Sequence, residues 1–361
     1  MRASPPGVRL AGVLSGPATA GSLAVCVAVM ATGCGKGDPT ARRPIEVITQ
    51  VGEVGISKGQ FSYPRCIDSD GDAIWVIDKA ARVQRLDPST GAYLGGWRMP
   101  DWKLGKPTGI TIAPGSGGEP LVYVADTHYH RVLIYRPGNA SEGADPPELV
   151  GQFGTFGEGP GEMVYPTDIA VLMEGDGSRP KRLYVGEYGG NDRVTVWEPG
   201  EAPNSFRFAF AFGRFGSGTE KSTPEFSRPQ SLAIDRVRNE LVLTDACNHR
   251  VGRFTLDGEL VAWFGSPDTA DDLPGHFKYP YGLCLLGDGS AMIAEFGNNR
   301  VQRIDLATGA SLGCYGTPGR GEGELVTPWG VAAVGDKIYV LDSGNNRVLA
   351  FARPRALAGG G

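Results

Sequence analysis

Pairs of oppositely charged residues recur six times along the 361-residue chain, each an acid followed four to six residues later by an arginine. A carboxylate and a guanidinium at this separation could bind a polar ligand, or could pair with each other and hold a loop through charge-assisted hydrogen bonds. Because a catalytic group is needed once and not in six copies, we interpret all of these residues as structural. The pairs are Asp78 with Arg82, Asp126 with Arg131, Glu187 with Arg193, Asp245 with Arg250, Glu295 with Arg300, and Asp342 with Arg347.

Metal binding would depend first on the histidines, because imidazole is a common zinc ligand. The chain has four: His128, His130, His249 and His276. The first two belong to the second copy of the charged pattern and His249 to the fourth, so a three-histidine site would require distant segments to converge. We therefore predict no metal site and no cofactor.

The segment Asp68-Ser-Asp-Gly-Asp72 has acids at alternate positions, as calcium loops do. A calcium loop also needs more oxygen ligands and a distal glutamate, which are missing here. Its Asp-Gly step is typical of a hairpin turn, and we interpret the segment as a turn. The sequence contains no P-loop or dinucleotide-binding fingerprint.

Cysteine chemistry remains open from the sequence. Four cysteines follow the N-terminal segment, namely Cys66, Cys247, Cys284 and Cys314, and none has CxxC spacing. An exported protein could pair them as disulfides, whereas buried free thiols are an equal alternative.

The elements that position all these residues are repeats. The repeat arginines are 49, 62, 57, 50 and 47 residues apart, which is the length of a four-stranded propeller blade. Each copy begins with a proline and continues with two short apolar runs, the acid, a short loop and Arg-Val. The prolines are Pro64, Pro107, Pro166, Pro229, Pro280 and Pro328.

The strands of the last copy are predicted at 330–334, 337–341 and 347–352, because each run is β-rich and bounded by turn residues. The fourth, outer strand of the earlier copies is predicted at 92–98, 148–154, 208–213, 259–265 and 310–316. No such segment follows residue 352, but EVITQVG at 46–52 has the required pattern. We therefore predict an all-β, six-bladed β-propeller, closed by an N-terminal strand that completes the C-terminal blade.

The repeats resemble the NHL repeat, whose pattern is Pro-x-Gly-apolar, a hairpin, then Asp-x-Gly-Asn-x-Arg-apolar. The sharpest copies are PYGLCLLGDGSAMIAEFGNNRVQRID and PWGVAAVGDKIYVLDSGNNRVLAF. In the looser first three copies, DKAARV and DTHYHRV lack the asparagine, and EYGGNDRV has one extra residue. The resemblance covers residues 46–352 and implies the propeller fold, whereas NHL propellers include enzymes, scaffolds and RNA binders.

One face of the expected propeller should collect the loops that join successive blades and the loops that precede the repeat arginines. Its residues differ between copies while the framework repeats, so we predict a ligand-binding face there. After the prolines it should present Arg65, Thr108, Asp168, Gln230, Tyr281 and Trp329, and from the other loops His128, Tyr129, His130, Tyr188, His249 and Phe296.

The N-terminus resembles a bacterial lipoprotein signal. Two arginines and an apolar, small-residue stretch lead to Ala31-Thr32-Gly33-Cys34. The resemblance implies that residues 1–33 are a signal peptide and that Cys34 is lipidated, with 34–45 as a flexible tether. We expect residues 46–352 to form the propeller and 353–361 a disordered tail, and we expect export to the cell envelope, on the periplasmic or cell-surface side.

The net charge of −5, without a basic stripe, opposes nucleic-acid binding. We favour a monomeric binding or scaffold module over an enzyme. It would recognise a protein, peptide or glycan through the variable face and touch the membrane only through its lipid. The alternative is a metal-dependent hydrolase or lyase with its site at the central channel. The zinc lyases among NHL-like propellers carry histidines just after the start of the inner strands, where this chain has none.

Overall fold

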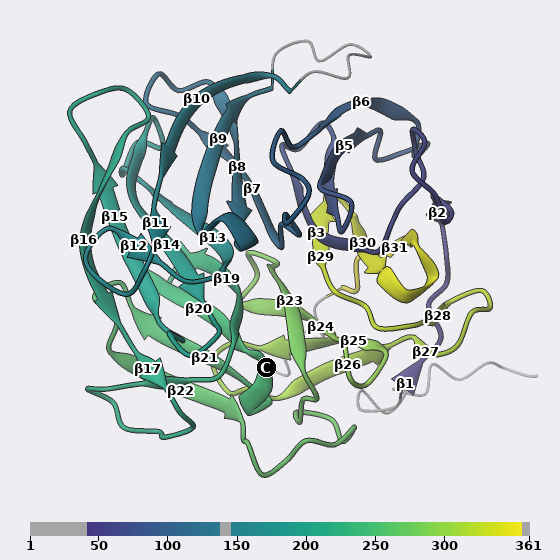
Figure 1. Cartoon of the computed structure of the whole chain (residues 1–361). Helices are drawn as coiled ribbons and strands as arrows, with labels where there is room; N and C mark the ends of the chain where they lie inside the picture. Colours follow the sequence, from purple (N-terminus) through teal and green to yellow (C-terminus); the bar gives the residue numbers. More distant parts are fainter. Residues whose placement is uncertain (1–41, 138–145, 356–361) are drawn as a thin grey trace, which may run out of the picture. The chain divides into compact units, whose positions relative to one another are not determined.

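The computed structural model describes residues 42–137 and 146–355. These residues form six blades, each a four-stranded antiparallel sheet, and the predicted fold class is confirmed (Figure 1). The predicted signal peptide, the lipidation site Cys34 and residues 356–361 lie outside the described residues. In chain order the blades contain β3 (Pro64–Ser69), β4 (Ile74–Asp78), β5 (Arg82–Leu86) and β6 (Tyr93–Arg98); β7 (Gly109–Pro114), β8 (Pro120–Asp126), β9 (Arg131–Arg136) and β10 (Glu148–Phe153); β13 (Pro166–Met173), β14 (Pro180–Glu187), β15 (Val194–Pro199) and β16 (Phe206–Phe212); β19 (Pro229–Asp235), β20 (Glu240–Asp245), β21 (Arg250–Thr255) and β22 (Leu260–Gly265); β23 (Pro280–Leu285), β24 (Ser290–Glu295), β25 (Arg300–Asp305) and β26 (Ser311–Tyr315); and β29 (Val331–Val334), β30 (Lys337–Asp342) and β31 (Arg347–Ala352) with β2 (Thr49–Val51).

The ring closes as the sequence predicts. Strand β2 pairs antiparallel with β31, with Val51 opposite Val348, and so supplies the fourth strand of the last blade. In Figure 1 the yellow C-terminal strands lie beside purple β2 and β3. This pairing covers an edge that would otherwise expose unpaired backbone groups. Strand β1 (Arg42–Arg43), at the end of the predicted tether, pairs in parallel with β26.

The hydrophobic core lies between blades. Six clusters of buried side chains each join one blade to the next, including the last to the first. Strand β4, for example, is buried along its whole length because it is covered on both faces by neighbouring blades. Its Ile-Trp-Val-Ile sequence suits this position, since β-branched and aromatic residues pack well on a pleated surface.

The innermost strands contact each other in the cyclic order β3, β7, β13, β19, β23 and β29. They approach so closely that only glycine fits at some positions. A Cβ on Gly109 would lie 2.6 Å from Asp168 Cα, and one on Gly282 would lie 2.8 Å from Gly330 Cα. This approach explains the glycine of the Pro-x-Gly pattern.

One end of the ring, which we call the top face, carries the repeat prolines, acids and arginines. The strand pairing of the first blade shows this. Pro64 at the start of β3 lies opposite Asp78 at the end of β4, and Arg82 at the start of β5 lies opposite Arg98 at the end of β6. The interblade loops 52–63, 99–108, 154–165, 213–228, 266–279 and 316–330 therefore all lie at this face. Three of them contain short parallel strand pairs: β11 (Thr155–Phe156) with β12 (Glu162–Met163), β17 (Arg214–Phe215) with β18 (Glu225–Phe226), and β27 (Thr317–Pro318) with β28 (Glu324–Leu325).

Candidate functional site at the top face

The repeat acids and arginines form six ion pairs. In the fourth blade Arg250 is fully buried, and its Nε donates to Asp245 Oδ2 at 2.8 Å. Its remaining N–H groups donate to the carbonyls of Ser217, Gly218 and Glu225 in the preceding interblade loop. The pair therefore fastens the top-face loops to the blade. These bonds reach the interblade loop, whereas the sequence suggested only the loop within the blade.

A second repeated contact joins five of the six blades to the next blade. The residue before the repeat arginine accepts a hydrogen bond from the backbone N–H of the residue before the next proline. His130 Nδ1 accepts from Tyr165 N at 3.2 Å, and His249 Nδ1 accepts from Tyr279 N at 3.1 Å. Asp192, Asn299 and Asn346 do the same for Arg228, Thr327 and Tyr63.

These contacts, present in five of the six blades, support strained backbone. The five residues that donate have positive φ angles between 44° and 64°, which non-glycine residues rarely adopt. The first blade has Ala81 at the accepting position, and the corresponding donor, Lys106, is absent from the residues with positive φ. His130 and His249, predicted as ligand-face residues, thus engage their Nδ1 atoms within the fold. Burial lowers the pKa of both imidazoles, in agreement with a neutral ring that accepts at Nδ1.

Aromatic rings gather at the mouth of the central channel. Tyr281 stacks on Phe296 with centroids 4.8 Å apart, and Trp329 meets Tyr281 edge-on at 4.7 Å. The Tyr63 and Trp329 ring centroids are 5.8 Å apart. The guanidinium group of Arg228 packs against both Tyr188 and Tyr281. We call these five rings the mouth cluster. Tyr281 and Phe296 both belong to the fifth blade, whereas Tyr188 belongs to the third blade and Tyr63 and Trp329 belong to the interblade loops 52–63 and 316–330. The ring arrangement of the blades brings these segments together.

Two guanidinium groups lie over the mouth cluster. Arg65 lies 5.0 Å from the Trp329 ring, and Arg228 lies 4.8 Å from Tyr188 and 5.0 Å from Tyr281. Arg228 Nε donates to Gln230 Oε1 at 2.8 Å, and Arg65 Nη1 donates to the Lys106 carbonyl at 3.1 Å. Burial lowers the pKa of Arg65, and the nearby charge of Arg228 lowers it further.

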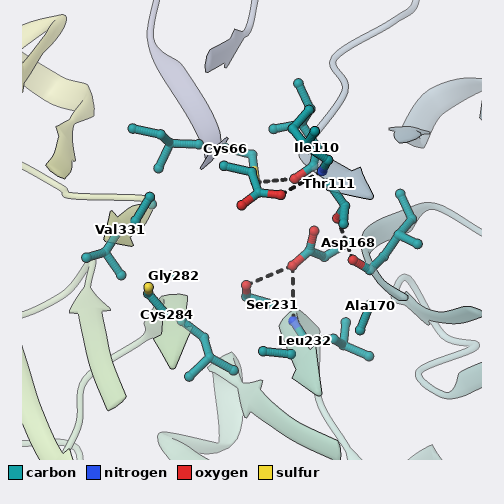
Figure 2. A pocket seen from close by; sticks show the side chains of 18 of the residues that line it. Cys66, Ile110, Thr111, Asp168, Ala170, Ser231, Leu232, Gly282, Cys284 and Val331 are labelled. Atoms are coloured by element: carbon teal, nitrogen blue, oxygen red, sulfur yellow. Dashed lines mark hydrogen bonds between the residues drawn. The ribbon is translucent and has the colours of Figure 1, made fainter. Parts of the chain in front are cut away.

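Below the mouth, the innermost strands line a cavity of about 370 Å³. Asp168 accepts hydrogen bonds from Ser231 Oγ at 2.8 Å and Leu232 N at 3.0 Å (Figure 2). Burial raises the pKa of Asp168 to about 7 and that of Asp68 to about 6. Cys284 also lines the cavity, and burial raises the pKa of its thiol to about 12. Burial thus makes the acidic groups of the cavity weaker acids than they are in water.

The structure brings together six of the predicted ligand-face residues along this cavity: Arg65, Thr108, Asp168, Gln230, Tyr281 and Trp329. His128 joins them indirectly, because its ring contacts Tyr165, which contacts Tyr188. His249 instead packs on Tyr279. The sequence analysis missed Arg228 and Tyr63. Both directly precede a repeat proline, two positions before the residues considered, and that position is the signal that could have identified them.

Metal-ligating side chains do not converge in the described residues, where no group of three or more His, Cys, Asp or Glu residues is placed to hold a metal ion. The Asp68–Asp72 segment turns between β3 and β4, with Asp70 Oδ1 accepting from the Asp72 and Ala73 amides. Cys66, Cys247, Cys284 and Cys314 are all free thiols. No helix in residues 42–137 and 146–355 has the length and hydropathy of a membrane span.

Comparison with known proteins agrees with this architecture. The NHL-repeat family model matches residues 226–254 and 325–351. The chain is therefore a six-bladed β-propeller that contains NHL repeats. A comparison with curated protein sequences finds no match.

Solved structures share the fold at low identity. A protein of unknown function from Bacteroides thetaiotaomicron has a TM-score of 0.57 at 16% identity, covering 84% of this chain and 76% of that one. Hydrazine synthase from Kuenenia stuttgartiensis has a TM-score of 0.52 at 13% identity, covering 82% and 97%. Virginiamycin B lyase from Staphylococcus aureus has a TM-score of 0.49 at 15% identity, covering 87% and 96%. At such identities the two matches with TM-scores above 0.5 establish the fold alone.

Proposed function

We propose that this chain is an extracytoplasmic binding module that recognises a protein partner through its top face. One observation carries the proposal. Of the thirteen exposed large hydrophobic side chains in the described residues, eight lie in the interblade loops of the top face. They are Val54, Ile56, Trp102, Leu104, Phe156, Phe215, Leu273 and Tyr279, which come from five of the six loops.

Exposed apolar side chains concentrated at one end of a molecule are typical of an interaction surface. The loops that carry them are fastened to the blades by the repeat ion pairs, so a partner would meet a preformed surface at a low ordering cost. At the opposite end of the ring, Val237 is 82% exposed in the turn between β19 and β20. It serves as a comparison site away from the top face.

Site-specific photo-crosslinking in cells tests this proposal with the full chain. A benzoylphenylalanine at Phe156 or Phe215 should capture a discrete partner, whereas the same group at Val237 should not. The crosslink from Phe156 should be lost when Phe215 and Leu273 are replaced by serine. Equal capture at Val237, or capture that the serine variant leaves unchanged, would contradict a top-face binding site.

We further propose that the module is anchored to the envelope through a lipid on Cys34. The lipoprotein-like segment Ala31-Thr32-Gly33-Cys34 supports this. Metabolic labelling with an alkyne fatty acid should mark the wild-type chain and not the Cys34→Ala variant. Labelling that persists in the variant would disprove lipidation at this residue.

A further inference from the structure

The two mouth arginines differ from the repeat arginines in having no carboxylate partner. All six repeat arginines form ion pairs, whereas neither Arg65 nor Arg228 has a carboxylate within ion-pairing distance among the described residues. Both are partly buried, and each packs a face on an aromatic ring. Two like charges are therefore held near each other at the channel mouth. The carboxylate of Asp192 interacts electrostatically with Arg228 and accepts from its backbone N–H, but it forms no ion pair with the guanidinium group. An anion bound between the two guanidinium groups would stabilise this arrangement.

Buried donors at the same place lack acceptors. The Nε of Arg65 and the Nε1 of Trp329 are buried and have no hydrogen-bond partner among the described residues. Trp329 is only 7% exposed and lines the cavity. A buried donor without an acceptor costs about 1–3 kcal/mol, so a ligand that supplied an acceptor here would be stabilised by relieving that cost.

The surrounding chemistry limits what that ligand could be. Guanidinium groups already cover faces of Trp329 and Tyr281, so those faces are less open for stacking by a sugar ring. Deeper in the channel, the ionised fraction of Asp68 and Asp168 would repel an anion that passed the mouth. An oxyanion is therefore favoured at the mouth itself, where N–H donors converge.

We propose that the mouth is an oxyanion receptor that holds an acidic side chain of the protein partner, bound by Arg65, Arg228 and the Trp329 indole. A carboxylate and a phosphorylated side chain share this chemistry, since guanidinium groups bind both. This inference rests on the proposed function, because the apolar loops would seat the partner while the mouth takes its acidic group.

The test follows the indole N–H of Trp329 in the full chain by ¹H–¹⁵N NMR, with its signal assigned from a Trp329→Phe variant. The probes are the blocked peptides Gly-Gly-Glu-Gly-Gly, its glutamine analogue and its phosphoserine analogue. The glutamate or phosphoserine peptide should shift the signal saturably and the glutamine peptide should not. The stronger of the two acidic probes identifies the favoured oxyanion.

Arg65→Gln and Arg228→Gln should each weaken binding at least tenfold, and Arg65→Lys should retain part of it. Arg320→Gln is the matched control, because Arg320 is an exposed cation in another top-face loop and its removal should change the affinity less than twofold. Equal shifts with the glutamine peptide, or full binding by both glutamine variants, would overturn the receptor.

The crosslinking experiment separates this inference from the proposed function. Partner capture that survives Arg65→Gln and Arg228→Gln would reject the oxyanion receptor while supporting top-face binding. Acidic-peptide binding without any partner captured at the loops would support the receptor and count against the proposed function.

Discussion

Asp168 offers the sharpest test of the energetics of the channel. Its carboxylate on β13 bridges to Ser231 and Leu232 on β19 of the next blade, and the side chain is only 6% exposed. Burial raises its pKa to about 7 from an ordinary value of 3.8; the charge of Asp68 also raises it, while the hydrogen bonds lower it. The folded protein therefore holds this proton more tightly than the unfolded chain does.

The sign of the pH dependence follows from this difference. Below about pH 4 the Asp168 carboxyl is protonated in both the folded and the unfolded state, so its ionisation does not change the free energy of unfolding. As the pH rises from about 4 to 7, the unfolded chain loses the proton first, so the free energy of unfolding falls, and above about pH 7 the loss is complete. At about 1.4 kcal/mol per pH unit, the loss amounts to at most about 4 kcal/mol.

Asp168→Asn removes this ionisation and keeps an oxygen to accept from Ser231 and Leu232. We expect the variant to be more stable than wild type at pH 8, by up to about 4 kcal/mol, and equally stable at pH 4. Urea unfolding followed by circular dichroism at pH 4, 6 and 8 measures the difference. Asp68→Asn serves as a graded control, and it should give a smaller gain because the pKa of Asp68 is raised only to about 6.

A stability difference that stays constant from pH 4 to 8 would refute the reasoning. So would an Asp168→Asn variant that is less stable than wild type at pH 8. Either result would mean that Asp168 is ionised in the folded protein at neutral pH and that the blade-to-blade bridge depends on its charge.

Three further perturbations test the framework. Arg250→Met should lower the free energy of unfolding by about 3–5 kcal/mol, because it leaves a buried carboxylate unpaired; a loss below about 1 kcal/mol in urea unfolding would contradict the buried ion pair. His249→Ala should cost about 0.5–1.5 kcal/mol, because it removes the solvent-exposed hydrogen bond from the Tyr279 backbone N–H, whereas His249→Asn should be nearly neutral; equal losses would show that the imidazole ring, not its acceptor, matters. A thiol reagent should label exposed Cys247 in the native protein and buried Cys314 only after unfolding; equal labelling rates would contradict the assigned burial.

The propeller fold could be predicted because its information is local and repeated. Prolines cannot donate to a strand ladder, and four of the six, such as Pro64, begin an innermost strand. The acids end the second strands and the arginines begin or directly precede the third. The displaced outer strand at 46–52 was visible because its pattern repeats five others, and its pairing with β31 is confirmed.

The role of the histidines was not readable from their type. His130 and His249 occupy a position that holds asparagine or aspartate in other blades, and all of these side chains supply one acceptor to a strained backbone N–H. A strained φ angle and the acceptor that supports it lie about 30 residues apart. Residue type alone therefore suggested a ligand where the fold uses a structural hydrogen bond.

The sequence by itself determined the blade count, the closure of the ring and the identity of the repeated ion pairs, because each follows from short segments of fixed pattern. Only the tertiary structure decided that Arg65, Arg228 and Trp329 meet at one mouth. These residues are more than 100 positions apart and belong to three different blades, and their proximity follows from the ring bringing its innermost strands together around one axis.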